Sequence, residues 1–224
     1  MPSRTLLATI AGVLILLLAA GGGYLYLHRG GAAAATSFSH GKLLYQARAA
    51  EAAWSTSSPP TADPPGSAGV TYSGGAIELN ILKAGGNLEG QLEAPALKNF
   101  AAELVVSAAP GTDLEINWWL RATEDSGLEL HVDLSTEAMS LEWTPNVGDA
   151  KVLAKDIPLP GLQSGRRIAI GIVADGSHLT LYRDGTRVAQ ADEAGANGGT
   201  TPGFFMDGNS GSLHLESVRY YAVH

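Results

Sequence analysis

The sequence predicts an all-β fold, an antiparallel β-sandwich or jelly roll, preceded by one N-terminal transmembrane α-helix and a Pro-rich linker. Apolar and polar residues alternate with a period of two through most of residues 70–224, as they do in strands that bury one face. Turn residues separate the alternating runs, and no convincing helical periodicity follows residue 54. We therefore expect roughly eleven to thirteen short strands, a pattern that favours two packed antiparallel sheets.

The clearest alternation lies in residues 113–122, and residues 127–134 and 168–174 repeat it. Because successive side chains of a strand point to opposite faces, each run predicts one inward and one outward set. Trp143 is expected in the core beside Leu141. The inward set of the first run is Leu114, Ile116, Trp118 and Leu120. The outward sets are Asp113, Glu115, Asn117, Trp119 and Arg121, and then Glu129, His131 and Asp133.

Two Asp-Gly pairs predict tight hairpins near the C-terminal end of the chain. Asp175-Gly176 separates residues 168–174 from residues 178–183, and Asp184-Gly185 separates the latter from residues 186–190. Asp-Gly favours the two-residue type I′ turn, which needs positive φ at both central positions. The sequence therefore predicts a three-stranded antiparallel meander here.

The N-terminal region predicts a membrane anchor. Residues 5–27 contain no charged side chain, and about 20 apolar residues suffice to cross the hydrocarbon core of a bilayer. Tyr24, Tyr26 and Arg29 would lie at the membrane interface. The alternative is a cleaved signal peptide, although the apolar run is longer than the usual hydrophobic region of such peptides. We divide the chain into the anchor (1–29), a membrane-proximal segment (30–69) and a β-sandwich domain (70–224).

The orientation of the anchor is a prediction that rests mainly on the domain behind it. Arg29, Lys42 and Arg48 outnumber the single Arg4 on the N-terminal flank, which by the positive-inside rule weakly favours a cytoplasmic C-terminus. Large domains are translocated largely regardless of this count. We expect a single-pass membrane protein with its C-terminal domain outside the cytoplasm, on the periplasmic side.

The segment between anchor and domain predicts a short helix followed by a spacer. Leu43, Ala47, Ala50 and Trp54 have helical spacing within residues 37–54. Residues 55–69 contain two Pro-Pro pairs and predict a semi-rigid extended linker.

Composition excludes several classes of function. The chain has no cysteine, so disulfides, thiol nucleophiles and cysteine-ligated metals are ruled out. Four basic and two acidic residues precede residue 70, which leaves 10 basic and 20 acidic residues in the domain. This acidic balance argues against a nucleic-acid partner, because phosphates bind basic surfaces.

The C-terminal third resembles a known superfamily. The residues are 161–193, which include the Tyr182-Arg183-Asp184-Gly185 hairpin, the Gly-rich run 198–208 and the closing strand 212–223. Together they resemble the concanavalin A-like lectin/glucanase superfamily, and in particular bacterial surface domains of that type. The resemblance implies a jelly-roll sandwich. Members of the superfamily include enzymes, sugar binders and protein-contact modules, so the fold leaves the function open.

The sequence gives little support for catalysis. Glycoside hydrolases of this superfamily carry carboxylates in a Glu-x-Asp-x-x-Glu-like pattern on one strand. The nearest match is Asp113-Leu114-Glu115-Ile116-Asn117, in which Asn117 and then Trp119 stand where further acids are needed. We therefore expect a non-catalytic member of the superfamily.

Metal and cofactor motifs are also weak. His131 and Asp133 share a strand face and could form a metal or acid–base pair, but no third ligand is evident. A structural calcium ion could be held by Asp207 or Asp125, although no motif specifies one. We expect no cofactor.

Trp119 is the best indication of a binding site. Its ring should point away from the core, where it could stack on a sugar, anchor a protein contact or pack under a loop. These three alternatives remain open from the sequence. The candidate contact face comprises Glu115, Asn117, Trp119, Arg121, His131 and Asp133.

The function expected from these features is that of a non-catalytic accessory or scaffold subunit of a membrane protein complex. Single-span subunits of bacterial electron-transfer complexes, such as alternative complex III, would have these features. The expected partners are other subunits of such a complex and the lipid bilayer around residues 5–27. The alternative is a cell-surface carbohydrate-binding or sensing domain with a glycan partner. The least favoured hypothesis is that the protein is a glycoside hydrolase.

Overall fold

A computed structural model describes most of the chain beyond residue 40. The predicted anchor, with Tyr24, Tyr26 and Arg29, lies outside the described residues. Within the part that is described, no helix is long and apolar enough to span a membrane. The described residues are 41–47, 59–73, 76–122, 126–145, 147–196 and 202–223.

The described residues form 14 strands and one short 3₁₀ turn at Leu162–Ser164. The first five strands are β1 (Leu43–Ala47), β2 (Thr61–Asp63), β3 (Ala68–Ser73), β4 (Ala76–Ile81) and β5 (Gly86–Gln91). They are followed by β6 (Phe100–Ala108), β7 (Asp113–Ala122), β8 (Gly127–Asp133), β9 (Ala138–Thr144) and β10 (Lys151–Pro158). The last four are β11 (Ile168–Asp175), β12 (His178–Arg183), β13 (Thr186–Asp192) and β14 (Gly203–Ala222).

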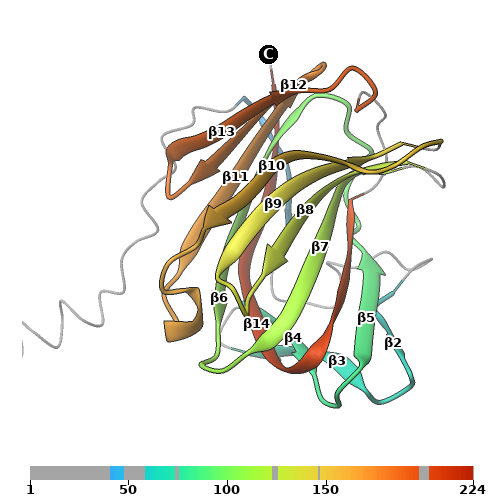
Figure 1. Cartoon of the computed structure of the whole chain (residues 1–224), viewed down its shortest axis with the longest axis vertical. Coiled ribbons are helices and arrows are strands. Elements are labelled where there is room, and N and C mark those ends of the chain that lie inside the picture. Colours follow the sequence, from blue (N-terminus) through green and yellow to red (C-terminus); the bar gives the residue numbers. More distant parts are fainter. Residues whose placement is uncertain are drawn as a thin grey trace, which may run out of the picture. The chain divides into compact units, whose positions relative to one another are not determined.

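The strands form two antiparallel sheets, which confirms the predicted β-sandwich. Sheet I has the order β2-β5-β14-β7-β8-β9-β10. Sheet II has the order β13-β12-β11-β6-β14, and both β4 and β1 pair with the far edge of β14, with β3 beyond β4. Figure 1 shows β7, β8 and β9 side by side, with β14 between β7 and β5.

Strand β14 is 20 residues long and belongs to both sheets. Its first part, residues 203–208, pairs with β5 and β7, whereas residues 211–222 pair with β4, β6 and β1. The register against β7 shifts between Gly208 and Ser210, where the strand leaves one sheet for the other. A Cβ atom on Gly208 would lie 2.5 Å from the carbonyl oxygen of Asp113, so the crossing requires glycine.

The core lies between the sheets and follows the predicted alternation. Leu114, Ile116, Trp118 and Leu120 are at most 3% exposed, and Trp143 is buried as predicted. The indole N–H of Trp118, on β7, donates a hydrogen bond of 2.9 Å to the hydroxyl of Tyr220, on β14. This bond satisfies two polar groups that burial would otherwise penalise.

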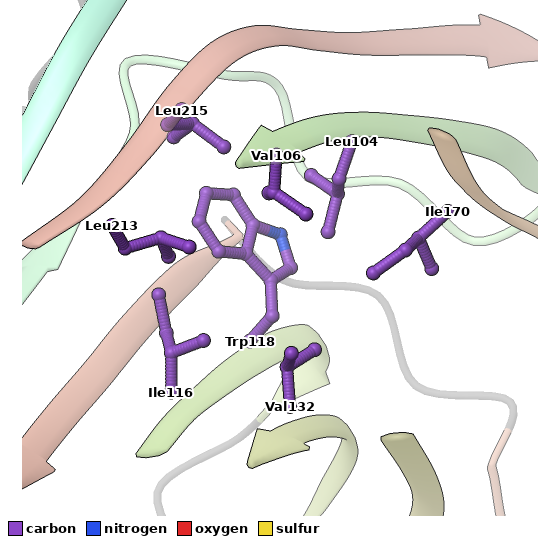
Figure 2. Close-up of a pocket in the computed structure, with 8 residues that line it drawn as sticks. All are labelled: Leu104, Val106, Ile116, Trp118, Val132, Ile170, Leu213 and Leu215. Atoms are coloured by element: carbon purple, nitrogen blue, oxygen red, sulfur yellow. The ribbon is translucent and has the colours of Figure 1, made fainter. Parts of the chain in front are cut away.

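A small cavity lies in this core. Figure 2 shows the indole of Trp118 among aliphatic side chains that come from both sheets. The cavity has a volume of about 10 Å³ and an entirely apolar lining. A space of this size holds one water molecule at most, and an apolar lining gives that water no partner. This cavity is therefore too small and too apolar to serve as a ligand site.

The predicted meander is confirmed. Strands β11, β12 and β13 pair in sequence, through turns at 176–177 and 184–185. Asp184 and Gly185 have φ values of 49° and 77°, as a type I′ turn requires. The predicted type I′ turn at Asp175-Gly176 is wrong, because Asp175 still pairs with His178 and the two-residue turn begins at Gly176, which has a φ of 57°.

The predicted helix over residues 37–54 is wrong where it can be assessed. Residues 43–47 form strand β1, which pairs with residues 218–221 of β14. The physical reason lies in the edge of β14, because β4 covers that edge only as far as Leu215. The backbone groups beyond it need partners, and β1 supplies them. Ala50 and Trp54 lie outside the described residues.

Strand pairing also extends into the predicted linker. Strand β2 pairs with β5 through Ala62 and Leu88, and β3 begins at Ala68. The first four residues of the Pro-rich stretch, 55–58, lie outside the described residues.

We predict that Gly208→Ala destabilises the protein by about 2 kcal/mol or more, because its methyl group would meet the backbone of β7. Chemical unfolding monitored by tryptophan fluorescence would measure the change. The matched control is Gly69→Ala in β3, whose new Cβ would meet no atom within 4 Å. Equal stability of the two variants would contradict a steric requirement at the crossing.

Candidate functional site

The side of sheet I that points away from the core carries a polar surface with two aromatic rings. This surface is formed by five neighbouring strands, β5, β14, β7, β8 and β9. Their register arranges the residues in three rows across the sheet, and we call the residues of these three rows the polar face. The rows are Gln91, Gly203, Trp119, Glu129, Glu142; then Glu89, Phe205, Asn117, His131, Ser140; and then Asn87, Asp207, Glu115, Asp133, Ala138.

The structure places five of the six residues of the predicted contact face on this surface. Glu115, Asn117 and Trp119 come from β7, and His131 and Asp133 come from β8. They meet because β7 and β8 pair directly, with Asn117 opposite His131. Period-two alternation within each strand keeps all five on the side opposite Trp118 and Leu130.

The sixth residue, Arg121, corrects the prediction. The register between β7 and β8 shifts after Trp119, so that Arg121 lies opposite Leu128. This irregularity reverses the alternation, and Arg121 turns inward and is 1% exposed. It therefore belongs to the interior and not to the polar face.

Arg121 holds three separated segments together. Its guanidinium donates hydrogen bonds to the carbonyl oxygens of Lys98, Gly176 and Ala196, the second at 2.9 Å. It also lies 5.5 Å from the centroid of the Phe100 ring, within the range of a cation–π contact. Burial lowers the pKa of Arg121 to about 10, and nearby Asp175 opposes this shift. The side chain therefore stays charged at neutral pH.

His131 lies at the centre of a group of carboxylates. Its Nδ1 atom is 3.0 Å from Oε1 of Glu115, and its Nε2 atom is 3.6 Å from Glu129 and 3.7 Å from Glu142. Glu129 and Glu142 are directly opposite each other on β8 and β9, where like charges repel. Burial and Glu142 raise the pKa of Glu129, although His131 opposes the shift. The single imidazole therefore does not neutralise this group.

The two aspartates of the third row differ in their surroundings. Partial burial and the neighbouring Glu115 raise the pKa of Asp207. Burial acts in the same direction on Asp133, but hydrogen bonds from Ser135 and Thr136 outweigh it and lower the pKa of Asp133. Asp133 thus stabilises the turn after β8, whereas Asp207 remains exposed on the face.

Two aromatic rings lie on the polar face, Trp119 and Phe205, and the sequence analysis identified only the first. Both are partly exposed, whereas their chain neighbours Trp118 and Phe204 are buried and stacked with ring centroids 6.0 Å apart. Gly203 lies opposite Trp119, and a Cβ atom there would come within 2.9 Å of the indole ring. Phe204-Phe205, like Trp118-Trp119, is a pair of adjacent aromatic residues in a strand. Such a pair predicts one ring in the core and one on the surface, so Phe205 could have been identified from the sequence.

Metal binding gains no support from the part of the chain that is described. No group of three or more His, Asp or Glu residues there is arranged to hold a metal ion. Asp207 contributes to the polar face, and Asp125, the other residue considered for calcium, lies outside the described residues.

Comparisons with known proteins found solved structures with a similar fold but no matching sequence family. No protein-family model and no curated protein matches the chain. A carbohydrate-binding module from Bacillus subtilis has a TM-score of 0.54 at 16% identity, over 73% of this chain and 95% of that one. A B. subtilis protein of unknown function with a galectin-like fold has a TM-score of 0.59 at 10% identity, over 83% and 99%. A glycoside hydrolase family 16 endo-glucanase from Bacteroides ovatus has a TM-score of 0.59 at 12% identity, over 79% and 99%.

These similarities confirm that the sandwich has the concanavalin A-like jelly-roll fold, as the resemblance of residues 161–223 implied. At such low identity they establish the fold alone.

We predict that Arg121→Met lowers the free energy of unfolding by about 3 kcal/mol, because three backbone carbonyls lose their charged donor. Chemical unfolding would measure the loss. The exposed Arg187→Met on β13 serves as control and should change stability by no more than about 0.5 kcal/mol. A similarly small effect for both variants would contradict the conclusion that Arg121 holds the three segments together.

We predict that Glu129→Gln raises the free energy of unfolding at pH 7 by roughly 0.5 kcal/mol, since it removes the repulsion from Glu142. A raised pKa in the folded state means that ionisation of Glu129 costs stability as the pH rises through its range. The gain should therefore disappear below pH 4.5, the ordinary pKa of glutamate. Chemical unfolding from pH 4 to pH 8 would measure it. Glu89→Gln, opposite Phe205, should show no comparable gain.

Proposed function

We propose that the polar face binds carbohydrate without cleaving it. The observation that carries the proposal is the pair of partly exposed rings, Trp119 and Phe205, within three rows of hydrogen-bonding side chains. Of the three alternatives for Trp119, this arrangement best supports stacking on a sugar. The anchor and the location outside the cytoplasm remain part of the same proposal.

The two rings offer adjacent apolar surfaces. Trp119 is opposite Gly203 and Phe205 is opposite Asn117, so the rings occupy diagonal positions on neighbouring strands, within reach of one ligand. A sugar ring has an apolar face of C–H groups and an edge of hydroxyl groups. An aromatic ring can pack against the face while neighbouring polar groups accept from the edge.

The residues beside the rings provide these acceptors. Glu129 lies opposite Trp119, whereas the Oδ1 atom of Asn117, opposite Phe205, is buried and is not one of these acceptors. Gln91 and Glu89 on β5 extend the first two rows on the other side of β14. Amide and carboxylate oxygens accept hydrogen bonds from hydroxyl groups, so a chain of sugar units running across the strands would meet acceptors in both rows.

Two further observations support binding over hydrolysis. Glu129 and Glu142 both lie within 4 Å of the same nitrogen of His131, so an imidazole takes the place that a glycosidic bond would need between two carboxylates. Glu115, the acid in the nearest match to the hydrolase pattern, also contacts His131. The fold is compatible with either function, because it is shared with a carbohydrate-binding module and with a glucanase.

The accessory role in a membrane complex has less support. It depends on the anchor, which lies outside the described residues, and the solved structures compared above offer no counterpart for it. Glycan binding uses residues whose arrangement is described, and it is therefore the function that we propose.

Affinity electrophoresis of the full-length protein tests the proposal. Gels would contain laminarin, hydroxyethylcellulose, glycol chitosan or pectin, and we expect retardation in at least one of them. Trp119→Ala and Phe205→Ala should each weaken binding about tenfold or more, since each removes a stacking surface. Tyr72→Ala, which removes an exposed ring from β3 of sheet II, is the control and should bind normally.

A reducing-sugar assay on the same polysaccharides should show no release of new chain ends. Normal migration in all four gels would contradict glycan binding, and turnover that is lost in Glu129→Gln or Glu115→Gln would contradict the non-catalytic assignment.

A further inference from the structure

The charges of the polar face are strongly unbalanced. Its three rows contain six carboxylates and one imidazole, and none of their positions holds Lys or Arg. Asp133 is engaged by the turn after β8, so five carboxylates face the surface with His131 as their one basic neighbour in these rows. The five are Glu89, Glu115, Glu129, Glu142 and Asp207.

Four acidic residues elsewhere in the described part of the chain have Arg or Lys partners. Glu103 lies 3.0 Å from Arg219 and Asp184 lies 2.7 Å from Arg166. Glu193 is 3.0 Å from Lys151, and Glu216 pairs with Arg167. The polar face differs from these ion-paired sites because its described carboxylates have no Lys or Arg partner, and His131 is the one basic group that they contact.

The carboxylates on the face also repel one another. Glu129 and Glu142 are directly opposite, and Asp207 is directly opposite Glu115. Such cross-strand pairs of like charge cost stability. A ligand that brings positive charge between them would relieve this cost on binding, whereas a neutral hydroxyl would not.

We infer that the polar face selects a cationic amino sugar, a polymer of glucosamine units with free amines, over neutral and anionic glycans. This inference rests on the proposed function, because Trp119 and Phe205 supply the stacking that any glycan would use. A primary ammonium group offers three hydrogen-bond donors and a full charge, and bonds from such a group to carboxylates are stronger than those between neutral groups. Anionic glycans would meet like charge, which excludes them.

Hexasaccharides with the same β-1,4-linked backbone provide the test. Isothermal titration at pH 5.5 would compare hexaglucosamine, its N-acetylated form, cellohexaose and a glucuronate oligomer on the full-length protein. At 50 mM salt hexaglucosamine should bind at least about tenfold more tightly than cellohexaose. At 300 mM salt this ratio should fall to about threefold or less, because salt screens exposed charges. The glucuronate oligomer should not bind.

The double variant Glu129→Gln/Glu142→Gln should reduce the ratio of the two affinities at least about threefold, with three of the five carboxylates still present. Removing a repulsive pair should leave the variant folded, which its unfolding curve would verify. Glu78→Gln, an acid on β4 in sheet II, is the matched control and should keep the wild-type ratio.

The outcomes separate the inference from the proposed function. Binding of cellohexaose or the N-acetylated hexamer as tightly as hexaglucosamine, or a ratio unaffected by salt, would overturn the inference and leave glycan binding intact. Failure of hexaglucosamine to bind would overturn the inference as well. The proposed function fails only if the polysaccharide gels also show no binding, or if Trp119→Ala leaves the binding unchanged.

Discussion

The arrangement of this protein depends on one strand that serves two sheets. Strand β14 pairs with β5 and β7 in its first part and with β4, β6 and β1 in its second. It can cross only because Gly208 allows the backbone of β7 to approach closely. The same strand therefore carries Phe205 on the polar face and Tyr220 in the core, and the positions of surface and interior groups are fixed together.

Period-two alternation links the packing of the core to the chemistry of the surface. In each of the doublets Trp118-Trp119 and Phe204-Phe205, one ring is buried and the other is partly exposed. The buried rings stack between the sheets, and the indole of Trp118 is bonded to Tyr220. Because the inward ring of a doublet determines where the outward ring lies, a well-packed interior positions a pair of aromatic groups on the outside.

Much of the fold and part of the candidate site could be predicted from the sequence. Alternation located Trp118, Trp119 and their neighbours correctly, because it depends only on local backbone geometry. The inward turn of Arg121 could not be predicted, since it results from a register shift against β8. Strand β1 forms where the edge of β14 lacks a partner, which is a tertiary effect that overrides helical propensity. The carboxylates around His131 meet only through strand pairing, so Glu142 carried no signal of its own.

The three hydrogen bonds of buried Arg121 have a consequence for the proposed binding of a glycan by Trp119. Arg121 lies two residues beyond Trp119 and fastens the end of β7 to carbonyl groups of three other segments. Gly203 meanwhile leaves just enough room for the indole to lie over β14. Because this backbone is already fixed, only the side-chain torsions of Trp119 would remain to be ordered on association. Less of the contact energy with the proposed glycan would then be lost to conformational entropy.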